Sequence, residues 1–195
     1  ASPRPLRLTG GVWGVSDPMS LEAGASGEEW VNDAIAVLDD LGWSRANVFA
    51  SLEGSLFALM MAAMHPDRVS RLVLFHGLAR GRSTSPTGSP PARASRDLPF
   101  PVIEDHERMM ERWRDGDVGD VFVSPELRGL NARLHRTQIS PGTMLQLQQV
   151  WDGIDVRPAL ASITAPTLVI NRRGATLPPP EIGERLAARI PGARF

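Results

Sequence analysis

Apolar positions in the first third of the chain switch between helical and strand-like spacing. Ser26 and Glu29 have the spacing of a capping box, and apolar residues then recur at helical intervals until Gly42. The short apolar run 46–50 predicts a strand, and after a turn the segment 55–64 is long enough to be a helix buried on most sides. This part of the chain is therefore predicted to form a helix, a strand and a buried helix.

Two later apolar runs predict buried strands of the same sheet. Residues 71–75 show little alternation between apolar and polar side chains, which is typical of a strand covered on both faces. Residues 166–171 form a second such run, and residues 181–190 predict a final helix. Strand, helix and strand in succession imply a parallel crossover, so the predicted fold class is α/β with a mostly parallel sheet.

The middle of the chain interrupts this alternation. Between Gly81 and Pro101 the composition is dominated by Ser, Thr, Pro, Gly and Arg, which predicts a mobile loop. Amphipathic helices are predicted over 102–114, 125–138 and 141–150, and we expect them to form a cap over one end of the sheet. The predicted organisation is a partial core (residues 1–80), a loop (81–101), a helical cap (102–160) and a continuation of the core (161–195).

Composition and charge narrow the classes of function. The formal net charge of −1 at pH 7 gives no bulk attraction to nucleic acid, so no nucleic-acid partner is expected. The absence of cysteine from the sequence excludes disulfides, thiolate metal sites and cysteine nucleophiles. No apolar run approaches the ~20 residues of a membrane helix, so we expect a cytoplasmic protein without membrane contact. The sequence holds no motif for a metal or a cofactor, and neither is expected.

Four segments resemble blocks of the α/β-hydrolase superfamily. They are Gly14–Pro18 (GVSDP), Glu29–Gly42, His65–Leu74 (beginning HPDRV) and Ala165–Ile170 (APTLVI). Within the superfamily, the chain resembles the hydrolase-like domains that accompany class III adenylate cyclases and regulators in actinobacteria. The resemblance implies an α/β-hydrolase sheet with a small helical cap, without the N- and C-terminal strands, and a fused cyclase or regulator domain as partner.

The triad positions that the resemblance implies hold residues without the required chemistry. Counting back from Pro66 as in the family places the nucleophile at Leu52, where a hydrolase has a serine on a sharp strand-to-helix turn. Leucine has no hydroxyl with which to attack a carbonyl carbon. The acid is expected directly after Gly174, where Ala175 stands and cannot orient an imidazole. The family's histidine would lie beyond Phe195, where this sequence ends.

The spacing around Leu52 still favours the turn itself. We predict that Leu52 lies at a strand-to-helix elbow with a strained backbone, because the pattern of small residues at Ala50 and Gly54 is retained. Ser51 and Ser55 flank this position, and neighbouring side chains on a tight elbow point elsewhere. Both serines are therefore interpreted as turn or helix-start residues.

Five residues are candidates for lining a pocket at the carboxyl end of the sheet: Leu52, Glu53, His76, Trp113 and Trp151. His76 follows a predicted strand directly and so lies near the edge where α/β proteins bind ligands, although a structural role in the loop is the alternative. Trp113 and Trp151 fall in the predicted cap, at spacings that suit packing over an apolar pocket. Packing within a core explains the two tryptophans equally well.

Three classes of function follow from these residues. The first is a non-catalytic ligand-binding or regulatory domain that keeps an apolar pocket lined by Leu52 for a small apolar ligand. The second is an active hydrolase or esterase of small acyl substrates that uses Ser51 as a displaced nucleophile. The third is a packing module that forms a homodimer. An esterase assay of the Ser51→Ala variant separates the enzyme from the other two.

Overall fold

A computed structural model describes residues 26–81, 110, 114, 129–130, 133, 137, 140–175 and 178–195 of the chain. Residues 82–101 of the predicted loop lie outside the described residues, and so do the GVSDP segment and Trp113. The chain divides into two compact units, of which one comprises residues 26–102 and 149–195 and the other residues 1–25 and 103–148. Helix α5 (Pro141–Gly153) contains the boundary between them. The sheet and the candidate site belong to the first unit.

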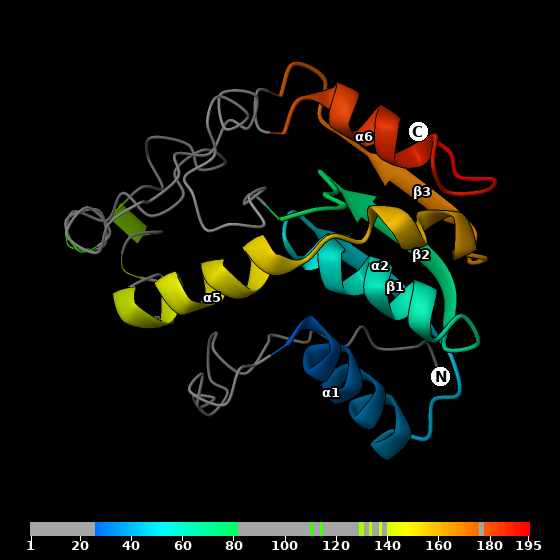
Figure 1. Cartoon of the computed structure of the whole chain (residues 1–195), viewed down its shortest axis with the longest axis horizontal. Coiled ribbons are helices and arrows are strands. Elements are labelled where there is room, and N and C mark those ends of the chain that lie inside the picture. The colour runs from blue at the N-terminus through cyan, green and yellow to red at the C-terminus, as the bar shows by residue number, and fades with distance from the viewer. Residues whose placement is uncertain are drawn as a thin grey trace. The chain divides into compact units, whose positions relative to one another are not determined.

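The first unit is built on a parallel sheet of three strands, β1 (Ala46–Ser51), β2 (Val69–Phe75) and β3 (Thr167–Ile170), in the order β1-β2-β3 (Figure 1). All three strands lie where the apolar runs predict them. Beyond the sheet, Arg194 forms an isolated parallel bridge with Leu168, so the last residues of the chain run beside β3. The predicted α/β class with a parallel sheet is confirmed.

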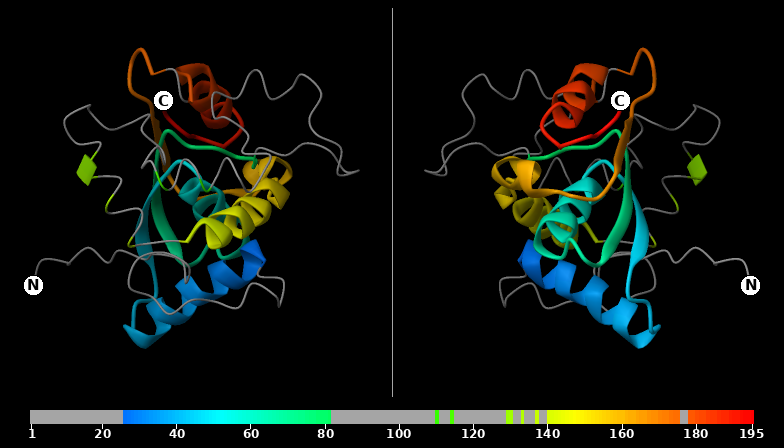
Figure 2. Two further views of the ribbon diagram at one scale, coloured as in Figure 1. Left: turned by 90° about the vertical axis from the view of Figure 1, so that its left-hand side faces the viewer. Right: turned by 90° about the vertical axis from the view of Figure 1, so that its right-hand side faces the viewer.

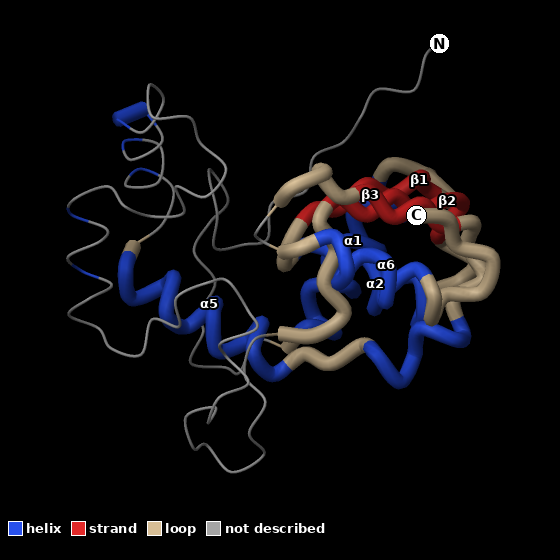
Figure 3. Tube along the Cα trace, turned by 90° about the horizontal axis from the view of Figure 1, so that it is seen from above, coloured by secondary structure: helices blue, strands red, loops and turns tan. Residues whose placement is uncertain are grey.

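Helices α1 (Gly27–Asp40), α2 (Gly54–Met64) and α6 (Pro180–Ala187) lie on one side of this sheet (Figures 2 and 3). The predicted capping box opens α1: the backbone N–H of Glu29 donates to the Ser26 hydroxyl at 3.2 Å, and the Ser26 N–H donates to the Glu29 carboxylate at 2.9 Å. Gly42, with φ of 67°, follows the end of α1 as predicted. No helix in the described part of the chain is long and apolar enough to cross a bilayer.

The hydrophobic core lies between the sheet and these helices. It contains Leu56 and Leu59 of α2, Leu72 and Leu74 of β2, each with no exposed surface, and Val169 of β3 at 1% exposure. Burial of each such side chain contributes about 1.5–3 kcal/mol. The segment that returns from α5 adds Ile154, Val156 and Leu160, the last from a short 3-10 helix (Arg157–Ser162). The end of the segment 102–160, assigned to the cap from the sequence, therefore contributes to the core of the sheet unit.

Arg68 of the HPDRV segment links the turns that lead into β1 and β2. Its guanidinium donates to the carbonyl oxygens of Ser44 at 2.9 Å and Trp43 at 3.2 Å, and to the carboxylate of Asp39 at 2.5 Å. These bonds tie the turn that leads into β2 to the turn that leads into β1. The two strands thereby enter the sheet side by side, and their carboxyl ends reach the same edge.

Candidate functional site

The strand-to-helix elbow lies where the sequence predicts it. Strand β1 ends at Ser51, helix α2 begins at Gly54, and Leu52 and Glu53 form the turn between them. Leu52 has φ of 50°, in the left-handed region that non-glycine residues rarely adopt. This conformation costs a leucine about 1–2 kcal/mol. The predicted strained backbone at Leu52 is confirmed, and strain of this kind concentrates at functional sites.

Backbone and hydroxyl hydrogen bonds hold the elbow from both sides. The Leu52 N–H donates to the Phe75 carbonyl oxygen at 3.2 Å, and the Leu52 carbonyl oxygen accepts from the Ser55 N–H at 3.0 Å. The hydroxyl of Ser55, which is fully buried, accepts from the Leu78 N–H at 2.7 Å. The same hydroxyl lies within donor reach of the carbonyl oxygens of Leu52 and Leu78. Ser55 is thus a helix-start residue, as predicted, and it fastens α2 to the segment after β2.

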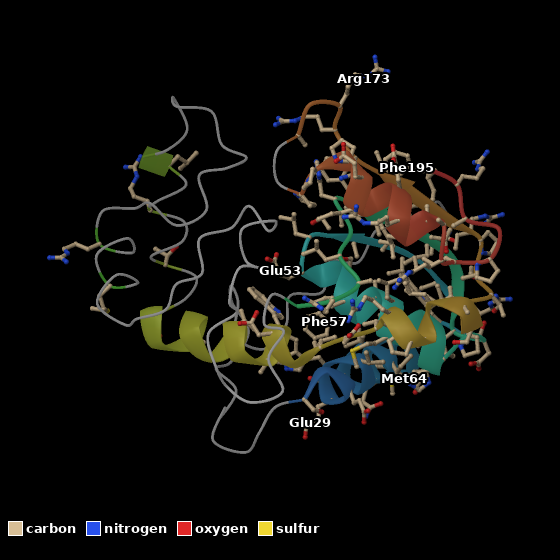
Figure 4. All side chains as sticks on the ribbon, turned by 45° about the horizontal axis from the view of Figure 1, so that its top comes forward. Glu29, Glu53, Phe57, Met64, Arg173 and Phe195 are labelled. Carbon is tan, nitrogen blue, oxygen red and sulfur yellow. The ribbon has the colours of Figure 1, made fainter. Side chains whose placement is uncertain are left out.

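Ser51 and Glu53 flank Leu52 in different ways. Ser51 is the exposed last residue of β1 and lies opposite Phe75 in the ladder. Glu53 is the N-cap residue of α2, its side chain is partly exposed, and it makes no capping bond to the helix (Figure 4). The elbow therefore presents an apolar side chain between a hydroxyl and a carboxylate.

The turn after β3 carries the position at which the resemblance expects an acid. Gly174 has φ of 72°, and the Ala175 N–H donates to the Arg172 carbonyl oxygen at 3.1 Å, which closes the turn. Ala175 is buried, whereas Arg172 and Arg173 are exposed. A methyl group at this position offers neither charge nor a hydrogen-bond acceptor for an imidazole.

His76 follows β2 directly and is 2% exposed, with φ of 53°. Its backbone N–H donates to the Ile170 carbonyl oxygen at 2.8 Å, and its Nδ1 lies 3.3 Å from the Asn171 Nδ2. Burial lowers the pKa of His76 below its usual value, the positive charge of Arg172 lowers it further, and a hydrogen bond with the Pro178 carbonyl opposes the shift. The neutral imidazole therefore joins the ends of β2 and β3 to the residues that lead into α6.

Asn171 is a residue that the sequence analysis missed. Besides facing His76, its amide nitrogen lies 3.5 Å from the Pro178 carbonyl oxygen, and its Oδ1 is buried without a hydrogen-bond partner among the described residues. An added Cβ at Gly183 would lie 2.2 Å from that oxygen, so the glycine makes room for it in α6. A polar residue directly after a buried strand is the signal that points to this position.

The remaining candidates do not all gather at the elbow. Trp151, near the end of α5, is partly buried against the core, and its indole N–H has no partner among the described residues. Its carbonyl oxygen lies so close to Gly81 that an added Cβ there would be 1.8 Å away. Trp113 lies outside the described residues. No group of three or more His, Cys, Asp or Glu side chains that could hold a metal occurs within the part of the chain the structure describes.

Comparison with known proteins relates this geometry to hydrolases. A 2-hydroxy-6-oxononadienedioate/2-hydroxy-6-oxononatrienedioate hydrolase of Cupriavidus pinatubonensis is 30% identical over 94% of this chain and 64% of its own length. A pimeloyl-[acyl-carrier protein] methyl ester esterase of Neisseria meningitidis is 29% identical over 91% of this chain and 66% of its own length. No protein-family model matches the sequence. The chain thus spans about two thirds of the length of these curated relatives.

A solved structure shows which fold this is. An alpha/beta hydrolase enzyme from a Medee basin deep-sea metagenome library superposes with a TM-score of 0.68, at 22% identity, over 93% of this chain and 66% of that one. The chain therefore has the α/β-hydrolase fold, and its strand-to-helix elbow is the feature of that fold that carries a nucleophile in catalytic members. At this place the present sequence has Leu52.

Proposed function

We propose that this chain is a non-catalytic α/β-hydrolase-fold domain that binds a small apolar ligand at the elbow. The observation that carries the proposal is Leu52 at φ of 50° between β1 and α2. The backbone keeps the conformation that aims residue 52 out of the sheet, but the side chain there can neither attack a carbonyl nor exchange a proton. What the position supplies is an apolar contact.

The surroundings of the elbow support binding rather than acyl transfer. Ala175 provides no carboxylate at the acid position, so an imidazole brought to this edge would have no partner there to fix its tautomer. His76 is buried against Asn171, in an environment that favours its neutral form. A regulatory role follows if a fused cyclase or regulator domain reads out the bound ligand, as the resemblance of the sequence implies.

The names of the curated relatives favour a second function, an esterase of small acyl substrates. In this alternative Ser51, exposed at the end of β1, attacks the substrate as a displaced nucleophile. Ser51 lies one residue before the elbow, within the strand, and its hydroxyl has no hydrogen bond to a base among the described residues. The alternative therefore lacks an activated nucleophile in the geometry of the described site.

Hydrolysis of p-nitrophenyl butyrate distinguishes the two functions. We expect the wild-type chain and the Ser51→Ala variant to hydrolyse the ester at the same low rate as the Ser44→Ala variant, which removes an exposed serine elsewhere. A rate that falls at least tenfold in Ser51→Ala alone would establish the esterase and overturn the non-catalytic proposal.

Binding is measured with octanoate, which offers an acyl chain and a carboxylate but no bond to cleave. We expect the Leu52→Asn variant to bind octanoate at least fivefold more weakly than the wild type, because asparagine tolerates the left-handed conformation but removes the apolar contact. The Leu41→Asn variant, at a leucine that is 43% exposed at the end of α1, should bind as the wild type does. Equal affinity in all three proteins would contradict binding at the elbow.

A further inference from the structure

The carboxyl ends of the three strands form one edge of the sheet, on which the elbow and the turn after β3 lie two strands apart. At the end of the ladder, Ser51 pairs with Phe75 and Phe75 pairs with Ile170. The Leu52 N–H donates to the Phe75 carbonyl oxygen at 3.2 Å. The His76 N–H donates to the Ile170 carbonyl oxygen at 2.8 Å, so the strands stay in step for one further residue. Because neighbouring strands are about 4.8 Å apart, Leu52 lies about 10 Å from the backbone that enters the turn after β3.

The charged side chains along this carboxyl edge are divided by sign. Glu53 is partly exposed at the elbow and places a carboxylate at the β1 end. Arg172 and Arg173 are both exposed and place two cations at the β3 end, where the turn 171–175 contains no carboxylate. Between them, on the middle strand, His76 is buried and its neutral form is favoured. The edge therefore has a negative end, an uncharged middle and a positive end.

Of the two arginines, Arg172 is the one whose charge acts along the edge. It lowers the pKa of His76 at the end of the neighbouring strand, whereas Arg173 takes no part in that shift. Figure 4 shows the Arg173 side chain extending outward, well away from Glu53. Within the part of the chain that the structure describes, the Arg172 guanidinium forms no ion pair or hydrogen bond. Its planar fork of N–H donors, which matches a carboxylate, is therefore available to a ligand.

We propose that the ligand of the elbow is an anionic amphiphile, a carboxylate on an unbranched apolar chain, whose head group binds Arg172 and whose chain runs along the carboxyl edge to Leu52. The inference rests on the apolar binding site proposed above and adds the chemical class of its ligand. An acyl chain of medium length spans the separation of about 10 Å between the two ends of the edge.

The division of charge fixes the orientation of this ligand. A carboxylate is attracted by Arg172 and repelled by Glu53, so the head group lies at the β3 end and only the apolar chain remains to contact Leu52. A cationic amphiphile would bind in the opposite sense, with its head beside Glu53 and its chain directed toward an exposed arginine. It would thereby lose the contact with Leu52. The edge selects an anion for this reason.

Two probes with the same chain separate the head group from the apolar contact. Octanoate and octan-1-ol share an eight-carbon chain and differ in the charge of the head group. The variants Arg172→Gln and Arg172→Lys remove and keep the cation, and Arg173→Gln is the matched control at the neighbouring exposed arginine. The variant Leu52→Asn reports on the apolar contact. Titration calorimetry of the 195-residue chain gives the dissociation constants at an ionic strength of about 0.01 M, where the Debye length is about 30 Å.

We expect the Arg172→Gln variant to bind octanoate about threefold or more weakly than the wild type, because a charge-assisted pair is lost. Its affinity for octan-1-ol should be unchanged. The Arg172→Lys variant should keep most of the octanoate affinity, since the ammonium group supplies the same charge. The Arg173→Gln variant should bind both probes as the wild type does. The Leu52→Asn variant should bind both probes more weakly, because the chain is common to them.

Two results would overturn the anionic class of the ligand. One is unchanged octanoate binding in Arg172→Gln, and the other is an equal loss in Arg172→Gln and Arg173→Gln, which would assign the effect to the bulk charge of the surface. In either case, weaker binding of octan-1-ol to Leu52→Asn would leave the elbow as the ligand site. If neither probe binds more weakly to Leu52→Asn, the apolar site at the elbow is itself wrong and the assignment of its ligand fails with it.

Discussion

The elbow after β1 and the turn after β3 share a backbone conformation but reach it by different means. Leu52 has φ of 50° and Gly174 has φ of 72°. At the turn after β3, glycine adopts this conformation without steric cost, so its own residue type encodes the turn. At the elbow, a leucine is held there by bonds to Phe75 and Ser55. The difference shows that the elbow conformation is imposed by its surroundings and not by the preference of the residue itself.

The largest expected effect comes from breaking the support of the elbow with the Ser55→Ala variant. Loss of the hydroxyl leaves the Leu78 N–H buried without its acceptor and should lower the free energy of unfolding by about 1–3 kcal/mol. The Ser162→Ala variant, which removes an exposed hydroxyl bonded to the Ala159 carbonyl oxygen, should change it by less than about 0.5 kcal/mol. Urea unfolding of both variants measures the difference. Equal stabilities would mean that Ser55 does not support the elbow.

The second prediction concerns the residue that encodes the turn after β3. Among the described residues, no atom lies within 4 Å of a Cβ added at Gly174, so a Gly174→Ala variant meets only the conformational cost of positive φ. We expect its unfolding free energy to fall by about 1 kcal/mol, as read from the midpoint of urea unfolding. Gly153 lies at the end of α5, lacks a positive φ and has no described residue within 4 Å of an added Cβ, so the Gly153→Ala variant should be close to neutral. A neutral Gly174→Ala variant would show that the turn relaxes to another conformation.

A smaller effect is expected when the strain at the elbow is removed by the Leu52→Gly variant. Relief of the left-handed conformation is offset by the greater backbone entropy of glycine in the unfolded chain and by the loss of a partly buried leucine. The unfolding free energy should therefore remain within about 0.5 kcal/mol of the wild type. Thermal unfolding followed by circular dichroism measures this. Destabilisation by more than about 1.5 kcal/mol would mean that packing of the leucine side chain holds the elbow in place.

The smallest effect is a dependence of stability on pH that originates at His76. Its pKa is lowered in the folded protein, chiefly by burial, so the unfolded chain binds more protons as the pH falls through the usual histidine value of about 6.5. Stability is therefore complete above this pH and declines below it, until the pH reaches the lowered pKa of the folded state. Urea unfolding at pH 7.5 and pH 5.5 measures the loss.

A His76→Asn variant tests whether this pH dependence of stability originates at His76, because asparagine also adopts the left-handed conformation found there. It should lose the pH dependence that the wild type shows between these two conditions. An unchanged pH dependence in His76→Asn would assign it to other groups.

The local part of this architecture was predictable from the sequence. The capping box at Ser26, the end of the first helix at Gly42, the strand that ends near Leu52 and the buried helix after it follow from residue spacing and from the conformational preferences of individual residues. The place of Leu52 at the elbow was also predictable, because the blocks around it fix the spacing along the chain. Each of these features depends only on residues a few positions away along the chain, so a short stretch of sequence is enough to predict it.

Only the tertiary structure decided which distant groups support the site. Ser55 meets Leu78 across 23 positions of the chain, and His76 meets Asn171 across 95. The exposure of Phe49 is also a tertiary result, since the alternation of β1 is compatible with either face being covered. Strand register and the side of the sheet on which each crossover helix packs determine these contacts. Both arise from the burial of apolar surface summed over the whole unit, a quantity that no local pattern of residues specifies.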